Sequence, residues 1–162
     1  MAFVAVIPPL ILLAVLPGET FAGASRLPEE VRSSLGNASA YEIRASVAAI
    51  PYSVRVAFAK TRGGESFAMA EPGAEWQLTD VVLKPGLPRR RLETVALSQS
   101  FCMLFYELGG RGHSHHVAVF RLQPDRATRV WRAVFDRPIG DAAALLATID
   151  EGKVEDDPKY GF

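Results

Sequence analysis

The sequence predicts an α+β domain, in which helices near the two ends of the chain cover one face of an antiparallel β-meander of about six or seven strands. Short apolar segments in the middle of the chain are separated by turn sequences, and helical patterns occur only towards its ends. Strands do not alternate with helices, as a doubly wound parallel sheet would require. A length of 162 residues suits one domain with a buried core.

Residues 1–24 predict a secretory signal peptide. Their apolar run ends at Leu16, a Pro-Gly break follows, and small residues occupy positions 22–24. This is the order of a hydrophobic region, a breaker and a cleavage site. A transmembrane span needs about 20 apolar residues, and two prolines interrupt this shorter run. We therefore expect cleavage near Ala22 or Ala24, no stable membrane anchor afterwards, and a periplasmic or secreted protein.

The remainder of the chain predicts a single globular domain over residues 25–152, followed by a loosely ordered tail over residues 153–162. Basic and acidic side chains number 18 each, so the formal net charge is zero. Because nucleic-acid-binding domains normally carry a basic excess, no nucleic-acid partner is expected. Only four of the basic residues are lysine. This arginine bias, together with many alanines, is typical of bacterial proteins encoded by GC-rich genomes.

The single cysteine, Cys102, excludes an internal disulfide. It lies within the apolar segment SFCMLFY at residues 100–106. A nucleophilic thiol needs a histidine partner and an electropositive, partly open setting, which a continuous apolar run does not offer. We predict a buried core thiol without a catalytic role.

The first and last helices are expected from their end signals. Pro28 suits a first helical position and Gly36 a stop, with apolar residues on one face between them. At the other end of the chain, Asp141 is a typical N-cap residue. The alanine-rich segment that follows it ends at Gly152.

A further helix is predicted over residues 39–50, because Ser39 and Glu42 have capping-box spacing and a proline follows the segment. Alternating apolar residues in the same segment would also suit a strand. The expected strands have period-two alternation and lie between turn sequences. They cover residues 52–60, 66–70, 75–83, 92–108 (as one strand or two), 115–122 and 128–135.

The segment ELGGRGHSHH, residues 107–116, predicts a hairpin, because glycine adopts positive φ without cost. An even-numbered loop places Glu107 on the same face as His116. An odd-numbered loop places it with His113 and His115, as a two-histidine, one-carboxylate set. The apolar pattern favours the even loop, because Phe101, Met103 and Phe105 then face Ala118, Phe120 and Leu122.

This preference argues against a metal site. A zinc site usually takes three or four protein ligands, and the rest of the chain has no histidine to add. We therefore predict a structural hairpin with polar strand ends, no bound metal and no cofactor. If a metal were held, His113 and His115 would be its candidate ligands.

Other signals are less specific. Residues Arg89, Arg90 and Arg91 predict a charged, solvated strand edge, with an anion-binding cluster as the alternative. Trp76 and Trp131 alternate with apolar residues and are expected in the core or along a groove. The sequence contains no nucleophile elbow, phosphate-binding loop or dinucleotide fingerprint.

Two functional hypotheses follow. The first is a non-catalytic binding module for an unidentified small molecule or protein. The second is a metal-dependent or acid–base hydrolase that uses Glu107 with His113, His115 or His116, with Glu107 and His116 as the catalytic candidates. The oligomeric state is left open. The binding candidates of the first hypothesis surround the hairpin and are Tyr106, Arg111, His113 and His115.

Overall fold

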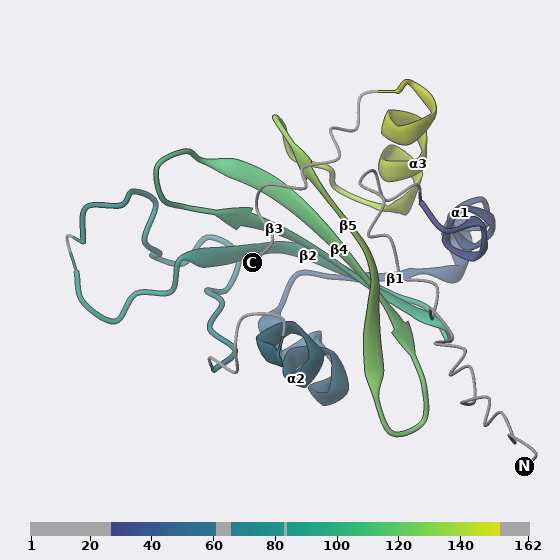
Figure 1. Ribbon diagram of the computed structural model, residues 1–162, viewed down its shortest axis with the longest axis horizontal. Coiled ribbons are helices and arrows are strands. Elements are labelled where there is room, and N and C mark those ends of the chain that lie inside the picture. Colours follow the sequence, from purple (N-terminus) through teal and green to yellow (C-terminus); the bar gives the residue numbers. More distant parts are fainter. Residues whose placement is uncertain (1–26, 61–65, 83, 153–162) are drawn as a thin grey trace, which may run out of the picture.

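The computed structural model describes residues 27–60, 66–82 and 84–152, so the predicted signal peptide and C-terminal tail lie outside the described residues. The fold is α+β, as predicted, with an antiparallel five-stranded sheet in the order β1-β2-β3-β4-β5 (Figure 1). The strands are β1 (Glu42–Arg44), β2 (Arg90–Leu97), β3 (Phe101–Leu108), β4 (Ser114–Leu122) and β5 (Ala127–Phe135), and the α-helices are α1 (Glu29–Leu35), α2 (Tyr52–Lys60) and α3 (Ala142–Asp150).

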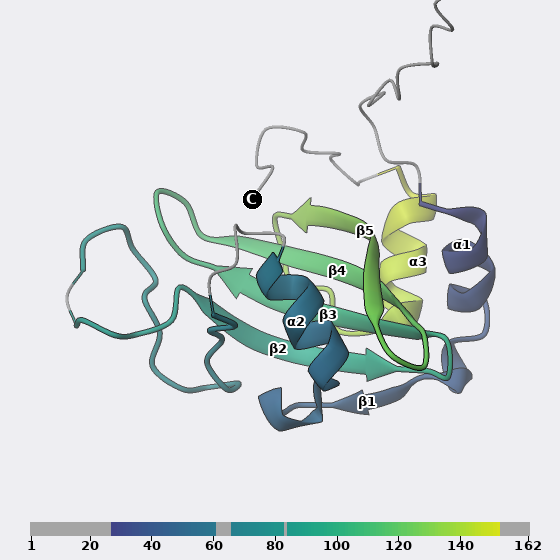
Figure 2. The same cartoon turned by 60° about the horizontal axis from the view of Figure 1, so that its bottom comes forward.

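Helices cover both faces of this sheet, not one face as the sequence predicted. Figures 1 and 2 show α1 and α3 on one side and α2 across the other. Successive residues of β3 therefore enter two separate apolar clusters. Met103 and Phe105 pack on the side of α1 and α3, whereas Leu104 packs beneath α2. A sheet buried on both faces explains why the middle strands are continuously apolar.

The two terminal helices form where their end signals predicted. The Asp141 carboxylate accepts a hydrogen bond from the Ala144 backbone N–H at 2.8 Å, which caps α3. An ion pair of 2.5 Å between Arg32 and Asp150 links α1 to α3. Val31 of α1 and Leu145 of α3 are fully buried, so the two helices form one layer against the sheet.

The helix predicted over residues 39–50 does not form. The segment contains β1 between two short 3₁₀ helices, η1 (Ala38–Ala40) and η2 (Val47–Ala49). Ile43, which the predicted helix would have placed on its apolar face, is 40% exposed. β1 instead pairs antiparallel with β2, with Glu42 opposite Leu97. The strand alternative for this segment is correct over three residues.

The strand predicted over residues 52–60 is the helix α2. Val54 and Phe58, four residues apart, are buried on its inner face, where they cover the second face of the sheet. The alternation of Val54, Val56 and Phe58 matched a strand because residues i and i+4 lie on the same face in an α-helix as well as in a β-strand. The segment forms a helix because its apolar side covers a sheet face that would otherwise be exposed to solvent.

Two further predicted strands are also absent from the described residues. Segments 66–70 and 75–83 make only isolated bridges, Ala70 with Arg91 and Thr79 with Gly110. Segment 92–108 divides into β2 and β3 at the turn 98–100, one of the two predicted alternatives. The sheet therefore has five strands instead of the predicted six or seven.

Cys102 and Trp131 are core residues. Cys102 is fully buried, as predicted, and Trp131 is 4% exposed. Within the described residues, no helix is both long and apolar enough to cross a membrane.

Candidate metal site

The β3–β4 hairpin has an odd-numbered loop, which corrects the predicted register. Leu108 pairs with Ser114 and Glu107 with His115, so five residues, 109–113, form the loop. The register also sets Phe105 opposite Val117. Both possible registers align apolar rows, and the five-residue turn selects between them.

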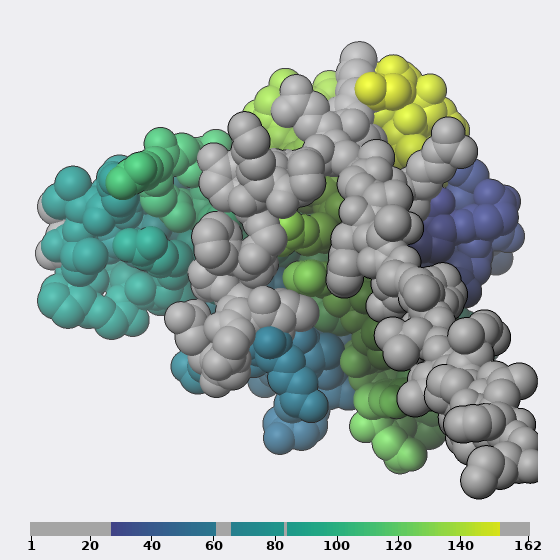
Figure 3. All heavy atoms as spheres, viewed as in Figure 1, coloured from purple at the N-terminus to yellow at the C-terminus, as the bar shows by residue number. Residues whose placement is uncertain are grey.

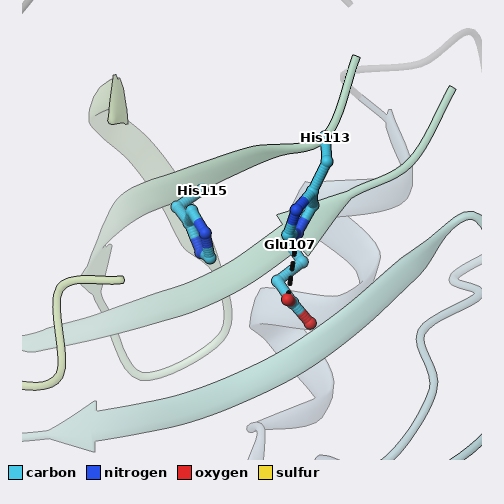
Figure 4. Close-up of side chains that lie close together, drawn as sticks. All are labelled: Glu107, His113 and His115. Atoms are coloured by element: carbon cyan, nitrogen blue, oxygen red, sulfur yellow. Dashed lines mark hydrogen bonds and ion pairs between the residues drawn. The ribbon is translucent and has the colours of Figure 1, made fainter. Parts of the chain in front are cut away.

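The register brings Glu107, His113 and His115 to the same face (Figure 4). The Nε2 atom of His113 lies 3.0 Å from Oε1 of Glu107. One potential ligand atom of each residue lies within 4.8 Å of those of the other two. The Glu107 and His115 side chains are 9% and 11% exposed, and that of His113 is 42% exposed. The cluster is therefore open to solvent on the side of His113.

Arg91 on β2 orients the Glu107 carboxylate. The two residues pair across β2 and β3, and Nε of Arg91 donates to Oε2 of Glu107 at 2.5 Å. Burial raises the pKa of the Glu107 carboxyl, but the hydrogen bond and charge of Arg91, with help from His113, hold that pKa below its usual value. Glu107 is therefore an ionised acceptor with one oxygen fixed by Arg91 and the other at His113.

A β-bulge brings a second carboxylate to the cluster. The pairing of β2 with β3 shifts between Leu92 and Thr94, which leaves Glu93 as the extra residue. Oε1 of Glu93 lies 2.6 Å from Nδ1 of His115. An ionised carboxylate can only accept hydrogen bonds, so Nδ1 is the donor. In the neutral imidazole this leaves the Nε2 lone pair of His115 available as a ligand.

Trp76 closes one side of the cluster. The centroid of the Trp76 ring lies 5.8 Å from that of the His113 ring. The Arg91 guanidinium lies over the Trp76 ring, 5.2 Å from its centroid. The loop that carries Trp76 is held to the segment before β2 and to the β3–β4 turn, since the Gln77 N–H donates to the Pro88 carbonyl and the Gly110 N–H to the Leu78 carbonyl. The loop and the hairpin turn therefore support the site together.

A cavity of about 680 Å³ lies beside the cluster. His113 at the end of the hairpin loop and Ser114 at the start of β4 form one wall, and Thr148 borders it from α3. Asp136 and Arg137, from the segment after β5, are exposed at its rim. His113 is the cluster residue that meets this cavity.

His116 does not meet Glu107, contrary to the face-sharing that an even loop would give. It pairs with Tyr106 in the hairpin and stacks on that ring, with centroids 5.2 Å apart. Ser114 Oγ lies 2.8 Å from its Nε2 atom. Because Tyr106 belongs to the cluster beneath α2, both aromatic rings lie on the opposite face of the sheet from Glu107.

The arginines that the sequence singled out lie in different surroundings. Arg111 is exposed in the hairpin turn, and Arg89 is exposed before β2. Arg90 is 8% exposed, and its guanidinium lies over the Phe58 ring at 5.3 Å. The three arginines are therefore not a uniformly solvated edge, because Arg90 is buried and Arg91 belongs to the candidate site.

Glu93 and Trp76 are members of the site that the sequence interpretation did not select. The spacing of Arg91 and Glu93 could have indicated that both share a strand face. Nothing in the sequence indicated that Trp76, fifteen residues before Arg91, folds back onto it.

Comparison of the chain with protein-family models, with curated proteins and with solved structures finds no match.

Proposed function

We propose that the protein is an exported, non-catalytic binding module whose ligand is one divalent transition-metal ion of the zinc class. Glu107, His113 and His115 would be its ligands. The observation that carries the proposal is the convergence of one potential ligand atom from each residue within 4.8 Å. Imidazole nitrogen and carboxylate oxygen are established zinc ligands, whereas calcium and magnesium prefer oxygen ligands alone.

Metal binding requires only a local rearrangement of these side chains. Metal–ligand bonds of about 2.0–2.2 Å set tetrahedral ligand atoms about 3.4 Å apart. The ion would replace the hydrogen bond between His113 and Glu107 and draw the three atoms inward. His113, the most exposed of the three, would move most easily.

The surrounding hydrogen bonds support this proposal. Metal-bound histidines commonly donate their second ring N–H to a carboxylate, which fixes the tautomer and raises ligand basicity. Glu93 is positioned to do this for His115. Arg91 holds the second oxygen of Glu107, leaving Oε1 for the ion. Two of the three ligands are therefore already oriented.

The proposed export of the protein is supported by the signal-like segment 1–24. The ligand set is suited to an oxidising compartment because it contains no thiol. Cys102 is fully buried and lies on the opposite face, in the cluster beneath α2. Oxidation of cysteine would leave this metal site unchanged.

A metal-dependent hydrolase is a second candidate, favoured by the cavity at His113. Three protein ligands leave one zinc coordination position for water, as in catalytic zinc sites. Ester hydrolysis that requires zinc and is lost in His115→Gln would support this candidate. Stoichiometric zinc without turnover of a broad ester panel would favour the binding module.

The first experiment is zinc titration of the purified, chelator-treated mature protein by calorimetry, with elemental analysis of the product. We expect one zinc ion per chain. His113→Gln and His115→Gln should each weaken binding by at least the roughly 10–100-fold that loss of an outer-shell partner costs. His116→Gln is the matched control, because His116 lies on the other face, and it should retain stoichiometric zinc.

Glu93→Gln tests the orienting role separately. It keeps a hydrogen-bond acceptor but removes the carboxylate charge, so zinc affinity should fall about tenfold while the stoichiometry stays at one. The proposal is wrong if wild-type protein takes up no zinc. It is equally wrong if His116→Gln reduces zinc affinity as strongly as His115→Gln does.

A further inference from the structure

A second cavity, of about 440 Å³, lies between α2 and the start of β5. It is on the opposite face of the sheet from the candidate metal site. Figure 2 shows α2 crossing the sheet beside the β4–β5 hairpin, and Figure 3 shows the two elements adjoining on the molecular surface. Volumes of about 300–1,000 Å³ are typical of small-molecule sites. The cavity is therefore large enough for a small organic ligand.

The cavity has an apolar wall and a cationic rim. Val56 and Ala57 of α2 face Ala127 of β5 across it. Lys60 and Arg126 lie at its edge and are exposed. Among its lining residues the cations outnumber the acids, because Asp125 is the one carboxylate beside Lys60, Arg126 and Arg129.

Arg129 is a partly buried charged group in this wall. The pairing of β4 with β5 shifts after Val119, and Arg129 stands opposite Phe120, whose side chain lies in the cluster beneath α2. Arg129 therefore lies on the sheet face that α2 covers, where it is partly buried. Burial and the charge of nearby Arg132 lower its pKa.

An anion at Arg129 would relieve this unfavourable environment. Within the described ranges 27–60, 66–82 and 84–152, no carboxylate forms an ion pair with Arg129. A partly desolvated guanidinium gains most from a charge-assisted, bidentate hydrogen bond to a carboxylate or phosphate. The adjoining apolar wall suits a hydrocarbon chain rather than a free inorganic anion.

We propose that this cavity binds a single-chain amphiphile with an anionic head group, such as a fatty acid. The head group would meet Arg129, and the chain would lie between Val56, Ala57 and Ala127. Tyr52, which is 81% exposed at the cavity, would cover part of the chain. This site is independent of the proposed metal function, because the two sets of residues lie on opposite faces.

The test compares probes of one chain length by calorimetry, each below its micellar concentration. Dodecanoate should bind the mature protein at one molecule per chain, and dodecyltrimethylammonium should not bind. Arg129→Gln should weaken dodecanoate binding about 10–100-fold, the usual effect of removing a hydrogen bond to a charged group. Arg44→Gln is the matched control, because Arg44 lies on β1 at the other edge of the sheet, and it should bind like wild type.

Ser53→Trp gives a second variant that changes no charge. Ser53 lines the cavity, so an indole there should obstruct the chain and weaken binding even if Arg129→Gln fails to fold. Sedimentation with phosphatidylglycerol vesicles distinguishes a free amphiphile from a bilayer surface, and we expect the protein to stay in the supernatant.

Three results would overturn the proposal. The first is equal affinity for the anionic and cationic probes. The second is an equal effect of Arg129→Gln and Arg44→Gln. The third is Arg129-dependent sedimentation with the vesicles, which would assign this face to a membrane surface.

Discussion

Gly109→Ala should be among the most damaging single-methyl additions in this protein. A Cβ atom at Gly109 would lie 2.1 Å from the Gln77 carbonyl oxygen and 2.6 Å from that of Leu78. Both are backbone atoms, so no rotamer change can relieve the contact. The loop carrying Trp76 would have to move away from the hairpin, and Trp76 with it.

The size of the effect can be worked out from these contacts. Forced overpacking typically costs about 1–3 kcal/mol. Displacing the loop also breaks the 3.0 Å hydrogen bond from the Gly110 N–H to the Leu78 carbonyl, which contributes about 0.5–1.5 kcal/mol. We expect Gly109→Ala to lower the free energy of unfolding by about 1.5–4.5 kcal/mol.

Two neighbouring glycines provide the controls in urea unfolding experiments. A Cβ at Gly112 would meet nothing within 4 Å, so Gly112→Ala should change the free energy of unfolding by less than about 0.5 kcal/mol. Gly110 also has open space, but its φ of 145° is one that residues with a side chain rarely adopt. Gly110→Ala should therefore give an intermediate loss. Equal stability of Gly109→Ala and Gly112→Ala would refute the steric argument.

Two further predictions concern titratable groups. Because the pKa of Glu107 is lowered below its usual 4.5, its contribution to the free energy of unfolding is fully present above pH 4.5 and is lost as the pH falls through the lower folded-state pKa. Urea unfolding from neutral pH to about pH 3 should show a shallower decline in Glu107→Gln than in wild type, and parallel curves would contradict this role. Burial raises the pKa of the Cys102 thiol to about 12, so native protein should react slowly with maleimide and denatured protein quickly. Cys102→Ala should cost about 1–2 kcal/mol through lost packing and leave zinc binding intact, and rapid native labelling would be inconsistent with the core position.

Local sequence signals were sufficient for the elements whose ends are fixed by their own residues. Asp141 caps α3 through a hydrogen bond three residues ahead, and no distant contact is needed to predict it. The glycine-rich hairpin is similar, since the sequence predicted a turn at its glycines and Gly110 has a positive φ. The burial of Cys102 followed from a continuous apolar run, which only a strand covered on both faces or a buried helix can accommodate.

Tertiary structure decided the elements whose pattern suits two conformations. The segment containing Val54 and Phe58 alternates like a strand, yet it is a helix because one sheet face required an apolar cover. The segment containing Ile43 has helical spacing, yet it forms an edge strand because β2 offered free backbone groups for pairing. In both segments a long-range contact outweighed a weak local preference.

The candidate site was likewise decided by long-range register. The sequence placed Glu107 and the histidines near one turn. Only the five-residue loop, however, pairs Glu107 with His115 and leaves His116 on the other face of the sheet. The bulge that brings Glu93 to His115 is a mismatch between two strands, and neither strand encodes it alone. A one-residue change in pairing moves every side chain to the opposite face. The sequence therefore showed which residue types could form the site, whereas the folded sheet determined which of their side chains come together.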